Sequence, residues 1–345
     1  MKRTKLLLIT IFVVTILFVG ACGISEEPLV GKSLTAELFT KNDTPNNPND
    51  GLDQNILSII TFEIDWEAID IDWEMEDWIQ PDPLTVELIR EIANLPYVEA
   101  FDYSIVASAQ SSELLEYWPG MEDDLVFTDE FPLWAELRGT SEAQLLQERA
   151  EIIELVEGRM FTDAEITTAS EINPVIVPSG FARINNFSIG STFTLDVIVR
   201  IPDPDGDWFD LDWFESDESI YAERRFEFEI IGIFDMIKEI DFNNFDNFDF
   251  FDDWMIYRMA SQLHVSNVVA EEMRRFEIDT WLEMMLELDT AEETPWMNLD
   301  EHHEPQLEST MILRDSLELE NFRAAAMELL PEFWLVNDTS IPMID

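Results

Sequence analysis

The sequence predicts an α+β protein in which a split strand-helix-strand base subdomain carries an inserted, more β-rich subdomain. Three observations support this fold class. A strand-helix-strand pattern runs from Ile56 to Ala107, and a second one runs from Thr310 to Val336. Between them, alternating apolar and polar residues indicate mostly strands. Because the two terminal units are alike, we expect one domain that is interrupted by another.

The opening unit begins with a strand-like apolar run, Ile56 to Ile64. Pro83 to Leu95 follows, with apolar residues at helical spacing and a proline at its start, where proline is favoured. Tyr97 to Ala107 is expected as the second strand. The closing unit repeats this order with a strand at Thr310 to Leu313, a helix at Leu319 to Leu330 and a strand at Phe333 to Val336.

The inserted block, residues 125 to 300, is expected to hold five strands and two helices. An acidic loop separates the last two strands, which we expect to pair because both alternate. An amphipathic helix is expected at Val268 to Leu288, with Val269, Met273, Phe276, Met284 and Leu288 at three- and four-residue steps. The strands are expected at Leu125 to Leu137, Ile152 to Val156, Pro174 to Pro178, Ser191 to Ile201 and Arg225 to Phe234, with a short helix at Ser179 to Asn186.

The charge balance excludes one class of partner. The chain has 74 Asp and Glu against 19 Lys and Arg, a net charge of −55. Nucleic acid is excluded because such binding needs clustered cations that displace counterions from phosphate. Because the chain is strongly negative, any protein partner is expected to present a basic face. The acidity also fits secreted proteins from salty or alkaline habitats, and the 46% of apolar residues is enough to build a core.

The first 21 residues have the layout of a secretory signal peptide. Lys2, Arg3 and Lys5 precede an apolar run from Leu6 to Val19, and two small residues stand directly before Cys22. The apolar run is shorter than the roughly 20 residues that a spanning helix needs. Cys22 is the only cysteine in the chain, so neither a disulfide framework nor a cysteine metal cluster is possible.

The run Leu17 to Cys22 resembles the lipobox of bacterial lipoproteins. That resemblance implies that Cys22 is lipidated and becomes the mature N-terminus on the extracytoplasmic face of the cell membrane. Residues 22 to 51 are then expected as a lipidated N-terminus and flexible linker, because Asn42 to Asp50 is polar and rich in asparagine and proline. The alternative is an uncleaved anchor with an incidental cysteine. Both alternatives place residues 23 to 345 outside the cytoplasm.

Several segments, in their order, resemble the extracytoplasmic core domain of MacB-like and FtsX-like ABC transporter permeases. The resemblance spans roughly residues 56 to 340. It is carried by the opening helix and "Leu-Pro-x-Val" strand, the "Gly-Arg-x-Phe-Thr-x-x-Glu" turn, a strand-helix-turn-strand segment, a "Val-Val-Gly-Ile-Phe" strand and the closing unit. In this sequence these are Pro83 to Ala100, Glu157 to Ile166, Pro174 to Phe193, Phe228 to Phe234 and Ser309 to Asp338.

The resemblance implies a MacB-like core over residues 52 to 345. Its base subdomain would combine residues 52 to 110 with 305 to 340, and residues 125 to 300 would be the insert. The family's domain binds partners or substrate and relays motion without a catalytic residue set, and no apolar span follows the core here. We therefore expect a non-enzymatic lipoprotein, an accessory or sensor module of an ABC-type export or signalling complex. Its expected partners are the membrane, through the lipid anchor, and an ABC permease, an ATPase or an envelope protein.

Two other functions stay open: an extracellular hydrolase that uses some of the many carboxylates, or a remnant of a truncated ABC permease. Asp203 to Asp210 suggests calcium, but its glycine stands at the fourth place and not the sixth, so an acidic hairpin loop is favoured. Glu301 to Glu304 contains two histidines without the i, i+4 spacing of a zinc helix, so a solvated loop is favoured. Ser179 lacks the Gly-x-Ser-x-Gly frame of a nucleophile.

Three acidic-aromatic runs are candidates for partner docking, with packing of the aromatic rings against the protein body as the alternative. No catalytic residue, cofactor or metal ligand is assigned, and Cys22 is the one site residue. The three runs are Ile64 to Trp78, Trp208 to Phe214 and Phe242 to Trp254.

Overall fold

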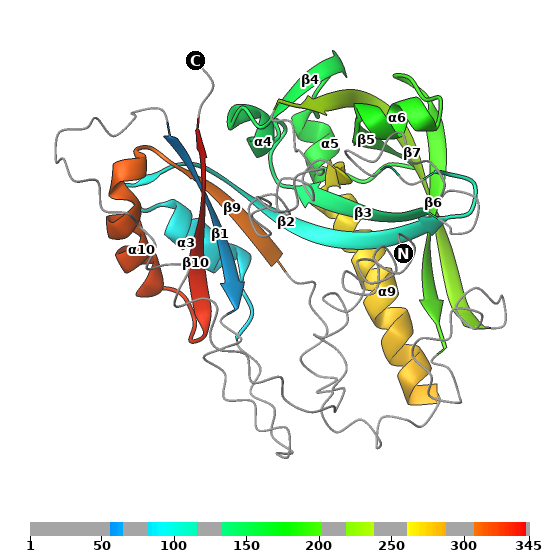
Figure 1. Cartoon of the computed structure of the whole chain (residues 1–345). Coiled ribbons are helices and arrows are strands. Elements are labelled where there is room, and N and C mark those ends of the chain that lie inside the picture. The colour runs from blue at the N-terminus through cyan, green and yellow to red at the C-terminus, as the bar shows by residue number, and fades with distance from the viewer. Residues whose placement is uncertain are drawn as a thin grey trace, which may run out of the picture. The chain divides into compact units, whose positions relative to one another are not determined.

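The computed structural model describes residues 56–64, 82–115, 117, 133–201, 219–237, 261–287 and 307–342 (Figure 1). The fold is mixed α+β, as predicted from the sequence. Its strands are β1 (Ile56–Ile64), β2 (Val98–Ser111), β3 (Leu133–Thr140), β4 (Ile153–Gly158), β5 (Ile172–Pro178), β6 (Thr192–Arg200), β7 (Ile220–Met236), β8 (Leu263–Ser266), β9 (Leu307–Leu313) and β10 (Trp334–Pro342). Its helices are α3 (Val86–Ala93), α4 (Leu146–Arg149), α5 (Asp163–Thr167), α6 (Ser179–Ile184), α9 (Asn267–Glu287), the short 3-10 helix η4 (Ser316–Glu318) and α10 (Leu319–Met327).

The first and last strands of the chain form one antiparallel sheet. Strand β1 pairs with β10 along its whole length, from Ile56 opposite Pro342 to Ile64 opposite Trp334. Strand β9 lies between β1 and β2 and is antiparallel to both. The spatial order β10-β1-β9-β2, with a helix after β1 and after β9, is the split βαβ arrangement. The two terminal units therefore interleave their strands.

Helices α3 and α10 cover one face of this sheet (Figure 1). Thr85 caps α3, since its hydroxyl accepts from the backbone N–H of Leu88 at 3.2 Å. The helix buries Ile89 and Ile92, and α10 buries Phe322 and Ala326. Alternate residues of β1 meet these helices, because successive side chains in a strand point to opposite faces.

The opposite face of the sheet is also covered. Ile59, Ala100 and Ile312 pack there against residues of the inserted segment. The inserted residues in this cluster come from α4, β4, β5, β7 and the turn before α5, and they are Leu145, Leu146, Ala150, Ile152, Ile153, Phe161, Ile176, Ile231 and Phe234. A sheet with two covered faces explains why β1 and β9 are rich in isoleucine and leucine.

Five strands of the inserted segment and β2 pair in a closed ring. Strand β2 pairs with β3, β3 with β8, β8 with β5, β5 with β7, β7 with β6, and β6 again with β2. Two of these contacts consist of a single residue pair, Ile176 opposite His264 and Gln110 opposite Asp196. The long β6–β7 ladder confirms the pairing that their alternating sequences predict. Strand β4 lies outside the ring and pairs with the end of β7.

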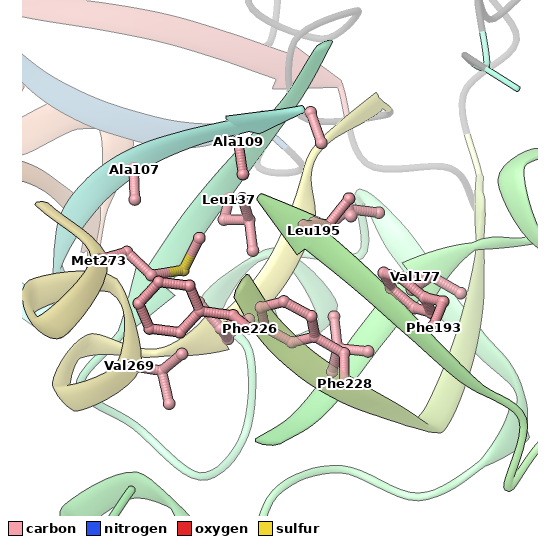
Figure 2. Close-up of a cluster of buried hydrophobic side chains, with 14 of the residues drawn as sticks. Ala107, Ala109, Leu137, Val177, Phe193, Leu195, Phe226, Phe228, Val269 and Met273 are labelled. Atoms are coloured by element: carbon pink, nitrogen blue, oxygen red, sulfur yellow. The ribbon is translucent and has the colours of Figure 1, made fainter. Parts of the chain in front are cut away.

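Apolar side chains from the ring and from α9 form the largest core (Figure 2). Ala107 and Ala109 of β2 face the rings of Phe226 and Phe228 on β7, so small residues oppose large ones. Phe228 stacks on Phe193 with ring centroids 5.6 Å apart. From α9, Val269 and Met273 enter the same core, as the amphipathic pattern predicts, whereas Leu288 lies outside the described residues.

Some elements were not predicted. The four-residue strand β8 and the one-turn helices α4 and α5 are too short to show a periodic pattern. Strand β7 begins at Ile220, five residues before the predicted start at Arg225. Strand β10 ends at Pro342, six residues beyond the predicted end at Val336. The other predicted strands and helices agree to within a few residues where the structure describes them. Part of the strand predicted at Leu125 to Leu137 lies outside those residues.

Candidate functional site

Strand β2 belongs to both sheets, and the candidate site lies where it passes from one to the other. Residues Val98 to Ile105 pair with β9, and residues Val106 to Ser111 pair with β3. One continuous backbone of 14 residues therefore joins the split βαβ sheet to the ring. Figure 1 shows this strand crossing between the two. We call the buried and partly buried polar residues around this crossing the polar junction; they are Asp102, Arg138, Thr140, Ser141, Asn267, Glu308 and Thr310.

Arg138 of β3 links the ring to β9. Its Nη1 donates to Oε2 of Glu308 at 2.6 Å, and its Nη2 donates to Oγ1 of Thr310 at 3.3 Å. The side chain of Arg138 is only 7% exposed, so these contacts replace the water that would otherwise stabilise its charge. Both partners lie on β9, more than 160 residues further along the chain.

Asp102 of β2 fixes the end of β3. Its Oδ2 accepts from the hydroxyl of Thr140 at 2.7 Å, and its Oδ1 accepts from the backbone N–H and the hydroxyl of Ser141 at 2.8 and 2.6 Å. Burial raises the pKa of Asp102, because the loss of hydration outweighs these hydrogen bonds and the charge of Arg138. The pKa of Glu142 is also raised, by its own burial and then by the charge of Asp102.

Asn267, the first residue of α9, completes the hydrogen bonding of β2 at the crossing. Its Oδ1 accepts from the backbone N–H of Ile105 at 2.9 Å, and its Nδ2 donates to the carbonyl of Tyr103 at 2.8 Å. Gly139 of β3 allows this close approach. A Cβ at that position would lie 2.2 Å from Oδ1 of Asn267 and 2.9 Å from the carbonyl oxygen of Ile105. The position therefore requires glycine for space.

His264 of β8 lies fully buried beside this junction. Burial, together with the nearby charge of Arg138, lowers the pKa of His264 to about 3. Within the described residues its Nε2 has no hydrogen-bond partner, and its ring meets the ring of Phe234 edge-on at 5.4 Å. The imidazole is consequently neutral at neutral pH.

The polar junction joins four elements of the fold. Asp102 on β2 hydrogen-bonds to the end of β3, Arg138 on β3 to β9, and Asn267 on α9 to β2. These contacts connect β2, β3, β9 and α9. Such a satisfied buried network favours one relative position of the elements it joins. The sequence analysis did not single out these residues. An aspartate inside an apolar strand and an asparagine directly before an amphipathic helix were the available signals.

The residues singled out from the sequence lie mostly elsewhere. Ser179 stands at the start of α6, and its hydroxyl donates to the carboxylate of Asp235. In the parts of the chain that the structure describes, no group of three or more His, Cys, Asp or Glu side chains could hold a metal ion. Cys22, Asp203 to Asp210, Glu301 to Glu304 and the three acidic-aromatic runs lie outside the described residues, apart from Ile64 at the end of β1.

None of the described helices is long and apolar enough to cross a membrane. The longest described helix, α9, has an apolar face because Val269 and Met273 pack into the core of the ring.

Comparison with known proteins found similar solved structures only. No protein-family model matches the sequence, and no curated protein matches it. The periplasmic region of MacB from Actinobacillus actinomycetemcomitans is 10% identical with a TM-score of 0.38, over 82% of this chain and 88% of that one. The extracellular domain of the noncanonic ABC-type transporter YknZ from Gram-positive bacteria is 14% identical with a TM-score of 0.39, over 81% of this chain and 99% of that one. Both are of the kind that the sequence motifs resemble.

Proposed function

We propose that this chain is a non-enzymatic extracytoplasmic lipoprotein that serves an ABC-type export or signalling complex as an accessory or sensor module. It would act by binding a protein or a substrate, and its lipid anchor at Cys22 would hold it at the membrane. The signal segment and the lipobox-like run before Cys22 support the location. The order of the motifs from Pro83 to Asp338 supports the type of complex.

The observation that carries the proposal is the sharing of β2 between the split βαβ sheet and the ring. Because β2 pairs with β9 on one part of its length and with β3 on the other, a force on the ring reaches β9 through one backbone. Arg138 and Asn267 reinforce this connection with side-chain hydrogen bonds. A module built in this way suits contact and relay, since binding at one part biases the position of the other.

The charge of the chain supports a protein partner with a basic face. At −55, the chain attracts cationic surfaces over distances of about a Debye length, near 8 Å at 0.15 M ionic strength. Encounter with such a partner should weaken as salt is added.

Cross-linking in intact cells followed by mass spectrometry tests the proposal. We expect to recover an ABC permease, an ATPase or an envelope protein with a basic face. Recovery of no such partner, together with reproducible turnover of a substrate by the purified chain, would instead support an enzyme.

Coupling can be tested separately with Asn267→Ala, which removes both contacts to β2. We expect faster hydrogen exchange at the backbone N–H of Ile105, which loses its acceptor, and weaker partner capture. The exposed helix variant Glu320→Ala serves as the matched control, because its ion pair with Arg323 joins residues of one helix.

A further inference from the structure

Strand β4 is an edge strand that contains a β-bulge and two exposed glutamates, Glu154 and Glu157. Among the described residues it pairs with β7 alone. The register shifts between Leu155 and Glu157, so Val156 is an extra residue in a β-bulge. An edge strand leaves a row of backbone N–H and C=O groups that another strand can pair with.

The bulge leaves an apolar side chain between two carboxylates. Val156 is 48% exposed, and Glu154 and Glu157 on either side of it are exposed as well. Ile189, which is 36% exposed, lies against the end of the strand, where its Cδ1 is 2.6 Å from the position that a Cβ of Gly158 would take. In the part of the chain that the structure describes, no arginine forms an ion pair with Glu154 or Glu157.

We propose that the outer edge of β4 binds an extended, basic segment of a protein partner, which adds to the sheet as a further strand. Its lysine or arginine side chains would contact Glu154 and Glu157, and an apolar side chain between them would cover Val156 and Ile189. This assignment rests on the proposed function, because it names the surface that meets the partner. Backbone pairing supplies affinity in this mode of recognition, and alternate side chains supply specificity.

Charge complementarity decides the occupant. A second copy of this chain would bring another net charge of −55 to the edge, and like charges opposite each other destabilise a strand pair. A basic strand reverses the sign of that interaction. The same carboxylates that prevent the chain from pairing with itself therefore favour a cationic strand.

Peptide titration tests the site directly. The full-length chain, purified in detergent, is titrated with a labelled eight-residue peptide of alternating lysine and valine, and binding is read by fluorescence anisotropy. Combining Glu154→Gln with Glu157→Gln should weaken binding by about three- to tenfold, the effect of two exposed ion pairs. Glu87→Gln with Glu91→Gln removes the same charge from the exposed side of α3 and should leave binding unchanged.

A second peptide separates strand addition from attraction by net charge. N-methylation at alternate residues keeps the charge of the peptide and removes its backbone donors, so it should weaken binding by about tenfold. Equal affinity for the two peptides would overturn the proposal, and so would an equal loss in both double variants or the absence of binding to the unmodified chain.

Site-specific photo-cross-linking in cells distinguishes this proposal from the broader one. A cross-linking residue is placed at Val156, and in a control at Leu335 on the other edge strand, β10, where the side chain is 38% exposed. We expect a transporter or envelope protein to be captured from Val156 only. Capture from Leu335 only would overturn the β4 site and leave the proposed function standing. Peptide binding at β4 with no such partner from either position would overturn the proposed function and leave the β4 site standing.

Discussion

The guanidinium of Arg138 and the carboxylate of Glu308 lie 2.6 Å apart, although the two residues are separated by 170 positions in the chain. Their exposure differs, because the side chain of Arg138 is 7% exposed and that of Glu308 is 35% exposed. The arginine is thus the desolvated member of the pair, while water still reaches the glutamate. Substitution of the glutamate and substitution of the arginine should therefore reduce the stability of the protein by different amounts.

We expect Glu308→Ala to destabilise the protein by about 2–3 kcal/mol, because it leaves a buried guanidinium without its carboxylate. Arg138→Met should cost less, about 1–2 kcal/mol, since the glutamate left behind can be hydrated. Urea unfolding measures both changes. Glu320→Ala is the control, because that side chain is 80% exposed, and it should cost less than about 1 kcal/mol. Equal costs for Glu308→Ala and Glu320→Ala would contradict the buried pair.

Gly158 and Gly190 allow a matched test of space against backbone conformation. Both have a left-handed φ, +84° and +82°. A Cβ on Gly158 would lie 2.2 Å from the carbonyl oxygen of Ile231, whereas a Cβ on Gly190 meets nothing closer than Glu229 at 4.0 Å. Gly190→Ala should therefore cost only the conformational strain, about 1–2 kcal/mol. Gly158→Ala should cost more than that in the same thermal unfolding assay, and a smaller cost than Gly190→Ala would refute the close approach.

His264 should make the protein sensitive to acid. The pKa of His264 is about 3 in the folded protein, compared with 6.5 for a histidine exposed to water. The folded state therefore excludes a proton that the unfolded state accepts. Stability from this residue is complete above pH 6.5 and is lost as the pH falls toward 3, by on the order of 4 kcal/mol. Asp102 acts in the opposite sense, because its pKa is raised and protonation favours the folded state.

Comparison of the unmodified chain with His264→Leu isolates the histidine from Asp102. The difference in unfolding free energy between pH 7 and pH 4 should shrink in the variant, as measured by urea unfolding at each pH. The same slope in both proteins would show that His264 is not the group that titrates.

Residues 52–110 should depend on the C-terminal residues for their stability, as the predicted composite base subdomain requires. Deletion of residues 305–345 removes β9 and β10, which are both neighbours of β1 in the sheet. The exposed edges and the lost cover over Ile89 and Ile92 should then abolish slow hydrogen exchange in β1 and α3. Unchanged protection of these segments would contradict the composite arrangement.

Cys22 should carry a lipid. The prediction follows from the short apolar run and the lipobox-like residues before the cysteine. Metabolic labelling with a fatty-acid probe should mark the unmodified chain, and Cys22→Ser should lose the label and leave the membrane fraction. Label that persists in the variant would disprove lipidation at this residue.

The periodic elements could be predicted from local pattern, and the polar junction could not. The helix α9 was predicted because Val269, Met273 and Met284 recur at the spacing of a helical face, and that face is buried. Strand β8 was missed because four buried residues carry no period. Asp102 and Asn267 looked like ordinary polar residues, since their partners are far along the chain.

The sequence by itself determined the fold class and the likeness of the two terminal units, because apolar spacing is a property of the chain alone. Only the tertiary structure decided that β9 enters between β1 and β2, that six strands close a ring through β2, and that Arg138 meets Glu308. These contacts join residues far apart in the sequence. A strand pattern indicates which face of a strand is buried, but not which strand becomes its neighbour.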